Sequence, residues 1–363
     1  MKAQARRLLR RLKRGFKKVA LRQLGMANEE YRAKMFARAA IPIINSLQPD
    51  VIWINDFNAS RGVTRCKGAQ NARIIYDSHE FWLGRNRPFS HTRFSRIVAP
   101  AIEQEENDLM CDVAAVVSVS SSILENLKLR ALSVAREEGS AHGKDPAGKF
   151  FLVRNIPKID PMNSDDEARI RASIGIRQFE ADSRENLELF YTGLITSNRC
   201  LENCIDAIGQ FNRHTSSFGK QIRLNLLGHG DPRFIDNLRT RGDWNDVSVC
   251  HHPPVPSSEV VSTLRAFADF CFVGNYPIHA SYRMALPNKF FEGLLSSKVV
   301  IYPDLVEMRR EAEGIPGMVA YNPFDTGSIF DAIREALRLR DSEFCRTYGH
   351  LNDENIISDL IAT

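Results

Sequence analysis

The sequence predicts an α/β protein of two domains, each built around a parallel β-sheet. Short apolar runs recur along the chain, polar residues follow each run, and helix-length segments separate the runs. A polar and charged stretch at residues 161–186 divides the runs into two series, as an interdomain linker would. With 363 residues, 43% of them hydrophobic, the chain is long enough to bury two cores.

The first series predicts a domain over residues 49–160. Its expected strands are the apolar runs 51–54, 73–76, 113–117 and 150–153, with helices at 95–110 and 121–134. In parallel sheets, ligands bind at the carboxyl ends of the strands. The polar residues placed at those ends are Asp56, Asp77, His79 and Ser120.

The second series predicts a domain over residues 187–345. Its expected strands are 187–192, 222–227, 247–250, 270–273, 299–302 and 318–320. Helices are expected within residues 1–48, one of them at 27–48, and residues 346–363 are expected to form a tail.

The stretch from Ala285 to Pro303 predicts a tight loop, an amphipathic helix and a buried strand. Pro287 suits the first turn of a helix, whose free N–H groups and positive dipole attract an anion. Lys289 adds a cation to that turn, and Glu292 lies on the same helical face, where it can accept hydrogen bonds from hydroxyls. A phosphate next to a ribose would satisfy both side chains. The alternative is an ordinary Lys–Glu pair on a solvated helix.

This stretch resembles the donor-binding motif of retaining glycosyltransferases of the GT-B fold, particularly the large family four. Members of that family carry a proline, a lysine and a glutamate at the relative positions of Pro287, Lys289 and Glu292. The resemblance implies two Rossmann-like domains that face a cleft, preceded here by the N-terminal helices. It also implies that Lys289 contacts the donor diphosphate and that Glu292 contacts the ribose.

Other segments resemble the same family in the same order, over about residues 50–340. Asp77-Ser78-His79-Glu80 is similar to a strand-end motif whose histidine faces the transferred sugar, although such a histidine is by itself more often structural. The turn from Gly193 to Glu202 is similar to the first loop of the nucleotide domain, in which Arg199 takes the place of a diphosphate-binding residue. The resemblance implies that the reaction depends on His79, Arg199 and Lys289, and that the donor is bound by Gly193, Arg199, Gly228, Asn288, Lys289 and Glu292.

The chain departs from the family at three places. Met284 stands where the family commonly has an acid that reaches the donor sugar, and Leu194 stands where an arginine often follows the loop glycine. In addition, helices replace the strands and the glycine-containing loop with which GT-B enzymes normally begin. The N-terminal sheet is therefore expected to be shortened or rebuilt.

Positive charge is concentrated at the N-terminus. Residues 1–22 hold ten basic residues and no acid, so the rest of the chain has 39 basic against 44 acidic residues. An apolar stripe at helical spacing within this segment predicts a basic amphipathic helix that lies on an anionic membrane surface. The alternative is a solvated helix packed on its own domain. Nucleic acid is not expected as a partner, because the remainder offers no basic surface.

Composition favours a cytoplasmic location. The seven cysteines are odd in number and scattered, which is typical of reduced thiols. No apolar run reaches the length of a membrane span, and no apolar core follows the basic N-terminus as in a signal peptide. A metal site at Cys250-His251-His252 is disfavoured, because no second ligand pair stands at a zinc-like spacing.

The expected function is therefore that of a metal-independent hexosyltransferase, retaining by resemblance. It would transfer a sugar from a nucleotide diphosphate sugar to a glycan or lipid-linked acceptor in cell-surface polysaccharide synthesis. No cofactor is expected, because Arg199, Lys289 and a helix N-terminus would stabilise the charge on the departing diphosphate. The alternatives are a non-catalytic nucleotide-sugar-binding or scaffolding subunit and another GT-B enzyme such as a nucleotide-sugar epimerase.

Overall fold

The computed structural model describes residues 27–60, 63–64, 66–84, 95–137, 146–157, 168, 186–215, 220–340 and 353–362. The predicted basic helix within residues 1–22 and nearly all of the predicted linker lie outside these ranges. Within them, no helix combines the length and the hydrophobicity that crossing a bilayer requires.

The chain forms two compact units, and the second is interrupted by a short piece of the first. Unit 1 comprises residues 1–154, 279–284 and 352–363, and unit 2 comprises residues 155–278 and 285–351. The chain therefore returns to unit 1 for six residues immediately before the motif that begins at Ala285.

Unit 1 is built on a parallel sheet whose strands follow one another in chain order, β1-β2-β3-β4. The strands are β1 (Val51–Asn55), β2 (Arg73–Ser78), β3 (Ala115–Ser118) and β4 (Phe150–Leu152). The α-helices are α2 (Ala27–Leu47), α3 (Phe57–Ser60), α4 (Ser95–Asp112), α5 (Ser121–Glu137), α10 (Ala280–Arg283) and α14 (Asp353–Ala362), and the 3₁₀ turns are η1 (Lys67–Ala69), η2 (Trp82–Gly84) and η3 (Pro146–Lys149).

Both faces of this sheet are covered, which explains why its strands read as unbroken apolar runs. On one face, Ile54, Tyr76 and Val116 pack with apolar side chains of α2, α4 and α5. On the other face, Ile75 and Val117 pack with Leu360 and Ile356 of the C-terminal helix α14. The predicted tail thus contains a helix that completes the core of unit 1.

Unit 2 contains a parallel sheet with the order β10-β9-β8-β5-β6-β7. The strands are β5 (Asn186–Thr192), β6 (Gln221–Leu227), β7 (Val249–His252), β8 (Phe270–Phe272), β9 (Val299–Pro303) and β10 (Met318–Tyr321). The helices are α7 (Leu201–Thr215), α8 (Pro232–Trp244), α9 (Val260–Phe267), α11 (Asn288–Leu295), α12 (Val306–Ala312) and α13 (Thr326–Leu339), with 3₁₀ turns η4 (Ser197–Arg199) and η6 (Ser257–Glu259).

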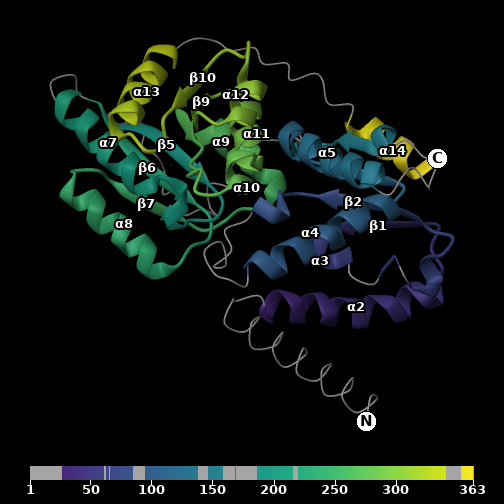
Figure 1. The fold of residues 1–363 in the computed structure, drawn as a ribbon. Helices are drawn as coiled ribbons and strands as arrows, with labels where there is room; N and C mark the ends of the chain where they lie inside the picture. Colours follow the sequence, from purple (N-terminus) through teal and green to yellow (C-terminus); the bar gives the residue numbers. More distant parts are fainter. Residues whose placement is uncertain are drawn as a thin grey trace. The chain divides into compact units, whose positions relative to one another are not determined.

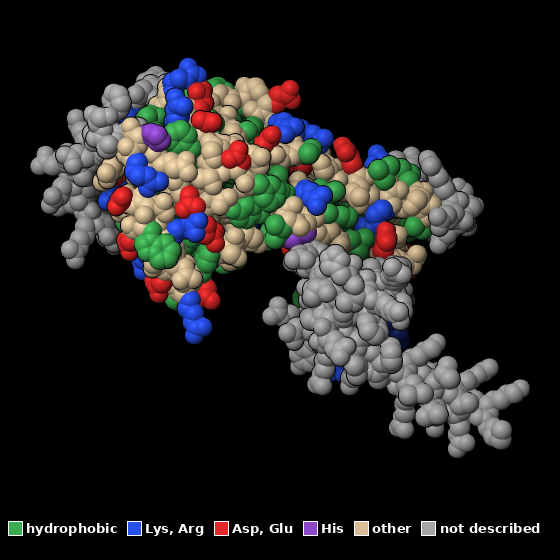
Figure 2. Space-filling view, turned by 60° about the vertical axis from the view of Figure 1, so that its left-hand side comes forward, with side chains coloured by type: hydrophobic (Ala, Val, Ile, Leu, Met, Phe, Trp, Pro, Cys, Tyr) green, Lys and Arg blue, Asp and Glu red, His purple; other side chains and the backbone are tan. Residues whose placement is uncertain are grey.

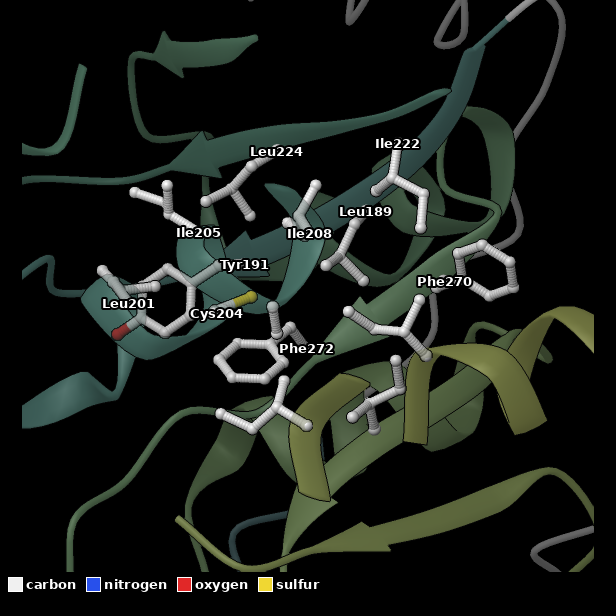
Figure 3. Close-up of a cluster of buried hydrophobic side chains, with 14 of the residues drawn as sticks. Leu189, Tyr191, Leu201, Cys204, Ile205, Ile208, Ile222, Leu224, Phe270 and Phe272 are labelled. Atoms are coloured by element: carbon white, nitrogen blue, oxygen red, sulfur yellow. The ribbon is translucent and has the colours of Figure 1, made fainter. Parts of the chain in front are cut away.

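Helices cover both faces of this second sheet (Figure 1). One face packs against α7, α8 and α13 in a core that includes Leu189, Tyr191 and Phe272 (Figure 3). The other face packs Phe190 and Val300 against α9, α11 and α12. The strand order is that of a Rossmann fold, since the chain builds β5, β6 and β7 in one direction and then β8, β9 and β10 in the other.

The predicted fold class is confirmed. Both sheets are parallel, and every predicted strand is present within a residue or two of its expected bounds. The largest shift is at β7, predicted at 247–250 and observed at Val249–His252. The tight loop, helix and strand expected between Ala285 and Pro303 form as α11 and β9.

Candidate functional site

The strand order of unit 2 locates a candidate ligand site. The order reverses between β5 and β8, so the connections from the carboxyl ends of these neighbouring strands run in opposite directions. In α/β sheets this reversal opens a crevice in which ligands bind. The loops that follow β5 and β8 contain Gly193, Arg199 and Asn275, and α11 follows the β8 loop.

Gly193 and Gly228 hold two of these loops in close contact. Gly193 has φ +98° and donates its N–H to the Leu227 carbonyl at 2.9 Å. Gly228 has φ +153°, and a Cβ there would overlap the carbonyl oxygen of Gly193. Both positions therefore need glycine, and of the two Gly193 is exposed at the sheet edge whereas Gly228 is buried.

Arg199 ends the 3₁₀ turn η4, directly before α7. Its guanidinium donates from Nη1 to Oδ1 of the buried Asn275, at 3.0 Å. Its carbonyl lies against Gly274, where a Cβ would overlap it. The loop after β8 thus fixes both the backbone and the side chain of Arg199 beside the switch point.

Lys289 is in the first turn of α11 and extends toward the end of β5. Its Nζ donates to the Tyr191 hydroxyl at 2.6 Å and lies 4.0 Å from the centre of the Tyr191 ring. A Cβ at Gly193 would be 3.7 Å from this ammonium. The cation is therefore beside the glycine loop and is held there by a strand residue.

Glu292 is one turn further along α11 and accepts a hydrogen bond from Thr192 Oγ1, at 2.7 Å. Within the described residues, no ion pair joins Glu292 to Lys289, and both side chains are partly buried against the end of β5. The alternative of a Lys–Glu pair on a solvated helix is therefore wrong.

Electrostatics make this edge of the sheet receptive to an anion. Burial lowers the pKa of Lys289 well below its usual value, and the neighbouring Arg199 lowers it further, while Glu292 acts in the opposite direction. Burial also raises the pKa of Glu292, against the effects of Thr192 and Lys289. An anion bound beside Lys289 would favour the charged form of its side chain.

The start of α11 adds backbone donors to the same place. Pro287 caps the helix with an extended conformation, one residue earlier than its predicted position in the first turn. Asn288, the first helical residue, is exposed. The Phe290 N–H donates to the Pro287 carbonyl at 2.9 Å. Asn288 and Lys289 come too early in the helix for their N–H groups to have an intrahelical partner, and this end carries the positive end of the helix dipole.

The loop after β6 is supported from β7. His251 Nε2 is 2.9 Å from the Gly228 carbonyl, and His252 Nε2 is 2.9 Å from Oδ1 of Asn225. Both histidine side chains therefore make contacts within unit 2. Across the described ranges, no three His, Cys, Asp or Glu side chains are grouped as ligands of one metal ion.

His79 lies in unit 1, after the carboxyl end of β2. Its Nε2 is 3.1 Å from Asp77 Oδ2, an oxygen that also accepts a hydrogen bond from Trp53 Nε1 at 2.9 Å. The hydrogen bond to Asp77 raises the pKa of His79 against the opposing effect of burial, and the charges of Asp56 and Glu80 raise it further. The side chain is 37% exposed, so the imidazole is accessible and favoured in its charged form.

Met284 also belongs to unit 1. Its carbonyl accepts a hydrogen bond from Ser120 Oγ at 2.8 Å, and its side chain packs at the edge of the α2–α4–α5 core. The position where the family commonly has an acid is therefore held by a thioether in a structural contact.

The comparisons with known proteins identify the fold. No protein-family model matches the chain, and no curated protein matches it by sequence. Among solved structures, it is similar to an alpha,alpha-trehalose-phosphate synthase (UDP-forming) from Burkholderia vietnamiensis, with 12% identity over 92% of this chain and 79% of that chain and a TM-score of 0.60. It is also similar to a structure described as trehalose-6-phosphate from E. coli bound with UDP-2-fluoro glucose, with 13% identity over 90% of this chain and 78% of that chain and a TM-score of 0.58. A glycosyltransferase from Rickettsia africae is similar with 12% identity over 92% of this chain and 76% of that chain and a TM-score of 0.55.

The chain has a GT-B fold. Of the residues expected to bind a donor, the structure brings Gly193, Arg199, Gly228, Lys289 and Glu292 to one edge of the unit 2 sheet. His79 is in the other unit of this fold.

Three residues of the site were missed from the sequence. Thr192 and Asn275 are polar residues at strand ends, a signal that could have been used. Tyr191 gave no such signal, because an aromatic residue in an apolar strand reads as core.

Proposed function

We propose that this protein is a glycosyltransferase that binds a nucleotide diphosphate sugar on unit 2 and transfers the sugar to a glycan or lipid-linked acceptor in cell-surface polysaccharide synthesis. The observation that carries the proposal is that two cations, Lys289 and Arg199, lie close together at the switch point. Glu292 is one helical turn beyond Lys289 on α11. Two similar structures support this choice of ligand, since one is named as UDP-forming and another is bound with UDP-2-fluoro glucose.

In the proposed reaction, the bond between the sugar's anomeric carbon and the terminal phosphate oxygen breaks, and a bond to an acceptor oxygen forms. The acceptor hydroxyl loses its proton, and the nucleoside diphosphate leaves with the bonding electrons. Lys289, Arg199 and the α11 N-terminus would stabilise that negative charge. We propose that these groups act without a divalent metal and that transfer retains the anomeric configuration, as the resemblance to family four implies.

Titration of the wild-type protein with UDP, GDP and inorganic pyrophosphate tests the donor site. Lys289→Ala removes a charge-assisted hydrogen bond that typically contributes about 1.5–3 kcal/mol, so affinity should fall roughly ten- to a hundredfold. Lys298→Ala is the matched control, because Lys298 lies just beyond α11 on the same connection to β9. Equal binding by wild type and Lys289→Ala, or no binding by wild type, would refute the assignment.

His79 is proposed to contact the transferred sugar. His79→Ala should lower sugar transfer, by about a hundredfold if the imidazole moves a proton, and should leave UDP affinity unchanged. Asp77→Asn should cause a smaller loss, because the hydrogen-bonded carboxylate favours the charged imidazole. Unchanged turnover in His79→Ala would assign the residue a structural role.

A non-catalytic donor-binding or scaffolding subunit is the second candidate function. It is favoured by Met284, whose backbone and side chain are both used in packing where the family has a sugar-binding acid. Measuring sugar release from UDP- and GDP-sugars separates the two functions. A scaffold would bind the nucleotides and release no sugar.

Residues 1–22 are proposed to bring the protein to the inner, anionic face of a membrane, because their ten cations are not matched elsewhere in the chain. Surface Lys and Arg side chains of unit 2 instead alternate with acids, as in the pairs Arg309–Asp304 and Arg338–Glu335 (Figure 2). This mixed surface also supports the proposal that nucleic acid is not a partner. Co-sedimentation with anionic vesicles should require residues 1–22 and weaken with salt, and equal binding without them would rule the proposal out.

A further inference from the structure

Tyr191 occupies an unusual position between the core and the candidate donor site. Its side chain is fully buried at the carboxyl end of β5, in the cluster formed with α7, α8 and α13 (Figure 3). Its hydroxyl nevertheless reaches two groups of the site, the Leu194 carbonyl and the Lys289 ammonium. Any buried hydroxyl needs a hydrogen-bond partner, and here both partners belong to the candidate site.

The two hydrogen bonds fix the orientation of the hydroxyl. It donates its one proton to the Leu194 carbonyl at 2.6 Å, and its oxygen accepts a hydrogen bond from Lys289 Nζ, also at 2.6 Å. The ring contributes as well, because the ammonium lies 4.0 Å from the ring centre. One side chain thus joins the glycine loop after β5 to the first turn of α11.

The other groups around Lys289 cannot replace this contact. Arg199 from η4 is a second cation, and Cys200 beside it is buried. The Glu292 carboxylate on α11 accepts from Thr192. Within the described ranges, no carboxylate forms an ion pair with Lys289, so the Tyr191 hydroxyl is the acceptor that holds its ammonium in place.

We infer that Tyr191 is a positioning residue for diphosphate binding, whose hydroxyl sets the Lys289 ammonium and the Gly193-Leu194 backbone in place before the ligand arrives. This inference rests on the proposed function. The ligand class is a diphosphate, alone or as part of a nucleotide sugar. Preorganisation of this kind improves affinity because less ordering remains for the ligand to induce.

The pH dependence of diphosphate affinity distinguishes a positioning role of Tyr191 from a role in packing alone. The hydroxyl and the ring both favour the charged form of Lys289, while burial and Arg199 oppose it. Removal of the hydroxyl therefore makes the ammonium lose its proton at a lower pH. Because the anion needs a charged lysine, the pH at which diphosphate affinity declines should move downward.

Tyr191→Phe tests the inference, because it keeps the ring and deletes only the hydroxyl. Its affinity for UDP and for inorganic pyrophosphate should fall by about tenfold, the usual effect of one hydrogen bond to a charged group. The matched control is Tyr321→Phe, in the same core, whose hydroxyl donates to the Val273 carbonyl at 3.0 Å and does not contact Lys289. The control should bind both probes like wild type.

Two further measurements complete the test. The first is ligand titration at a series of pH values. The phosphate groups of the ligand also titrate, so each variant is compared with wild type under the same conditions. Only Tyr191→Phe should lower the pH at which affinity declines. In a Lys289→Ala background, Tyr191→Phe should cost almost nothing more. Three outcomes would each overturn the inference while leaving the proposed function intact. Tyr191→Phe could show the affinity and pH profile of wild type, or Tyr321→Phe could lose as much affinity as Tyr191→Phe. The effects of Tyr191→Phe and Lys289→Ala on affinity could also be fully additive. A wild-type protein that binds neither probe would overturn the proposed function with it.

Discussion

Glu106 in unit 1 and Lys289 in unit 2 each meet a tyrosine hydroxyl on a neighbouring strand, but their other neighbours differ. Glu106 accepts from Tyr76 at 2.9 Å and from Arg130 at 2.7 Å, so its charge has an opposite partner. Lys289 meets Tyr191 at 2.6 Å, and the nearby cation Arg199 makes its charge less favourable. The charge of Glu106 is therefore balanced by a cation of the protein, whereas the charge of Lys289 would be balanced by the anion that the proposed function requires.

This difference separates structural from ligand-binding use of buried charge. A paired charge stabilises the fold once its partner is present, and removing that partner is costly. A charge without an opposite partner lowers stability and is expected where binding needs it. The same logic applies to Glu188 in unit 2, which is buried and receives hydrogen bonds from Arg223 and Asn225 far from the ligand edge.

The largest expected effect is in unit 1. Glu106→Ala leaves Arg130 without its buried carboxylate partner, so we expect a loss of about 3–5 kcal/mol in the free energy of unfolding. Intrinsic fluorescence during urea unfolding reports it, because Trp53 and Trp82 lie in unit 1. Asp236→Ala, which removes an exposed pair with Arg239, is the control and should cost less than about 1 kcal/mol. Similar losses in the two variants would remove the distinction.

A smaller effect is expected from Glu292→Gln. If Glu292 binds the ribose, UDP affinity should fall by about tenfold, because a hydrogen bond to a charged group is replaced by one to a neutral amide. Pyrophosphate, which has no ribose, should bind nearly as before. The amide oxygen can still accept from Thr192, so the fold should be retained. Calorimetric titration measures both ligands, and an equal loss for the two would place Glu292 near the phosphates instead.

The smallest effect is a gain in stability in the absence of ligand. The pKa of Lys289 is lower in the folded protein than in the unfolded chain, so its penalty is fully present below the lowered pKa and disappears as pH rises toward the ordinary lysine value. Lys289→Met should therefore be more stable than wild type at neutral pH by on the order of 1 kcal/mol, and this difference should shrink as pH rises. Urea unfolding across pH measures it, with Lys298→Met as the control. A variant less stable than wild type would show that Lys289 supports the fold.

Much of the fold could be predicted from the sequence because most of its strands are short apolar runs. Val299–Pro303 is buried throughout, and in Val51–Asn55 four apolar residues are followed by a polar one that marks the end of the strand. The strand order could not be predicted in the same way, since an apolar run does not show which strand it will neighbour. The packing of α14 against β2 and β3 was missed for a similar reason, because its partners are more than 200 residues away.

The candidate site was predictable where a residue type is unusual in its surroundings. A lysine and a glutamate after a proline, or a glycine after an apolar strand, indicate a need other than packing, and the structure brings these residues together around Gly193. The state of Lys289 was not predictable, because it depends on Tyr191 and Arg199, which are about 90 to 100 residues away along the chain. The sequence predicted a cation in the first turn of the helix, and the structure holds this cation against a tyrosine ring.

The passage of the chain between the units has a mechanical consequence. Residues 279–284 belong to unit 1, and α11 begins at Asn288 in unit 2, so Ala285, Leu286 and Pro287 form the short connection that follows one of the crossings between the units. Leu286 is buried, and the ring of Pro287 fixes its φ angle, which leaves few torsions able to yield. Any displacement of residues 279–284 would therefore be passed through this short connection to the helix that carries Lys289 and Glu292.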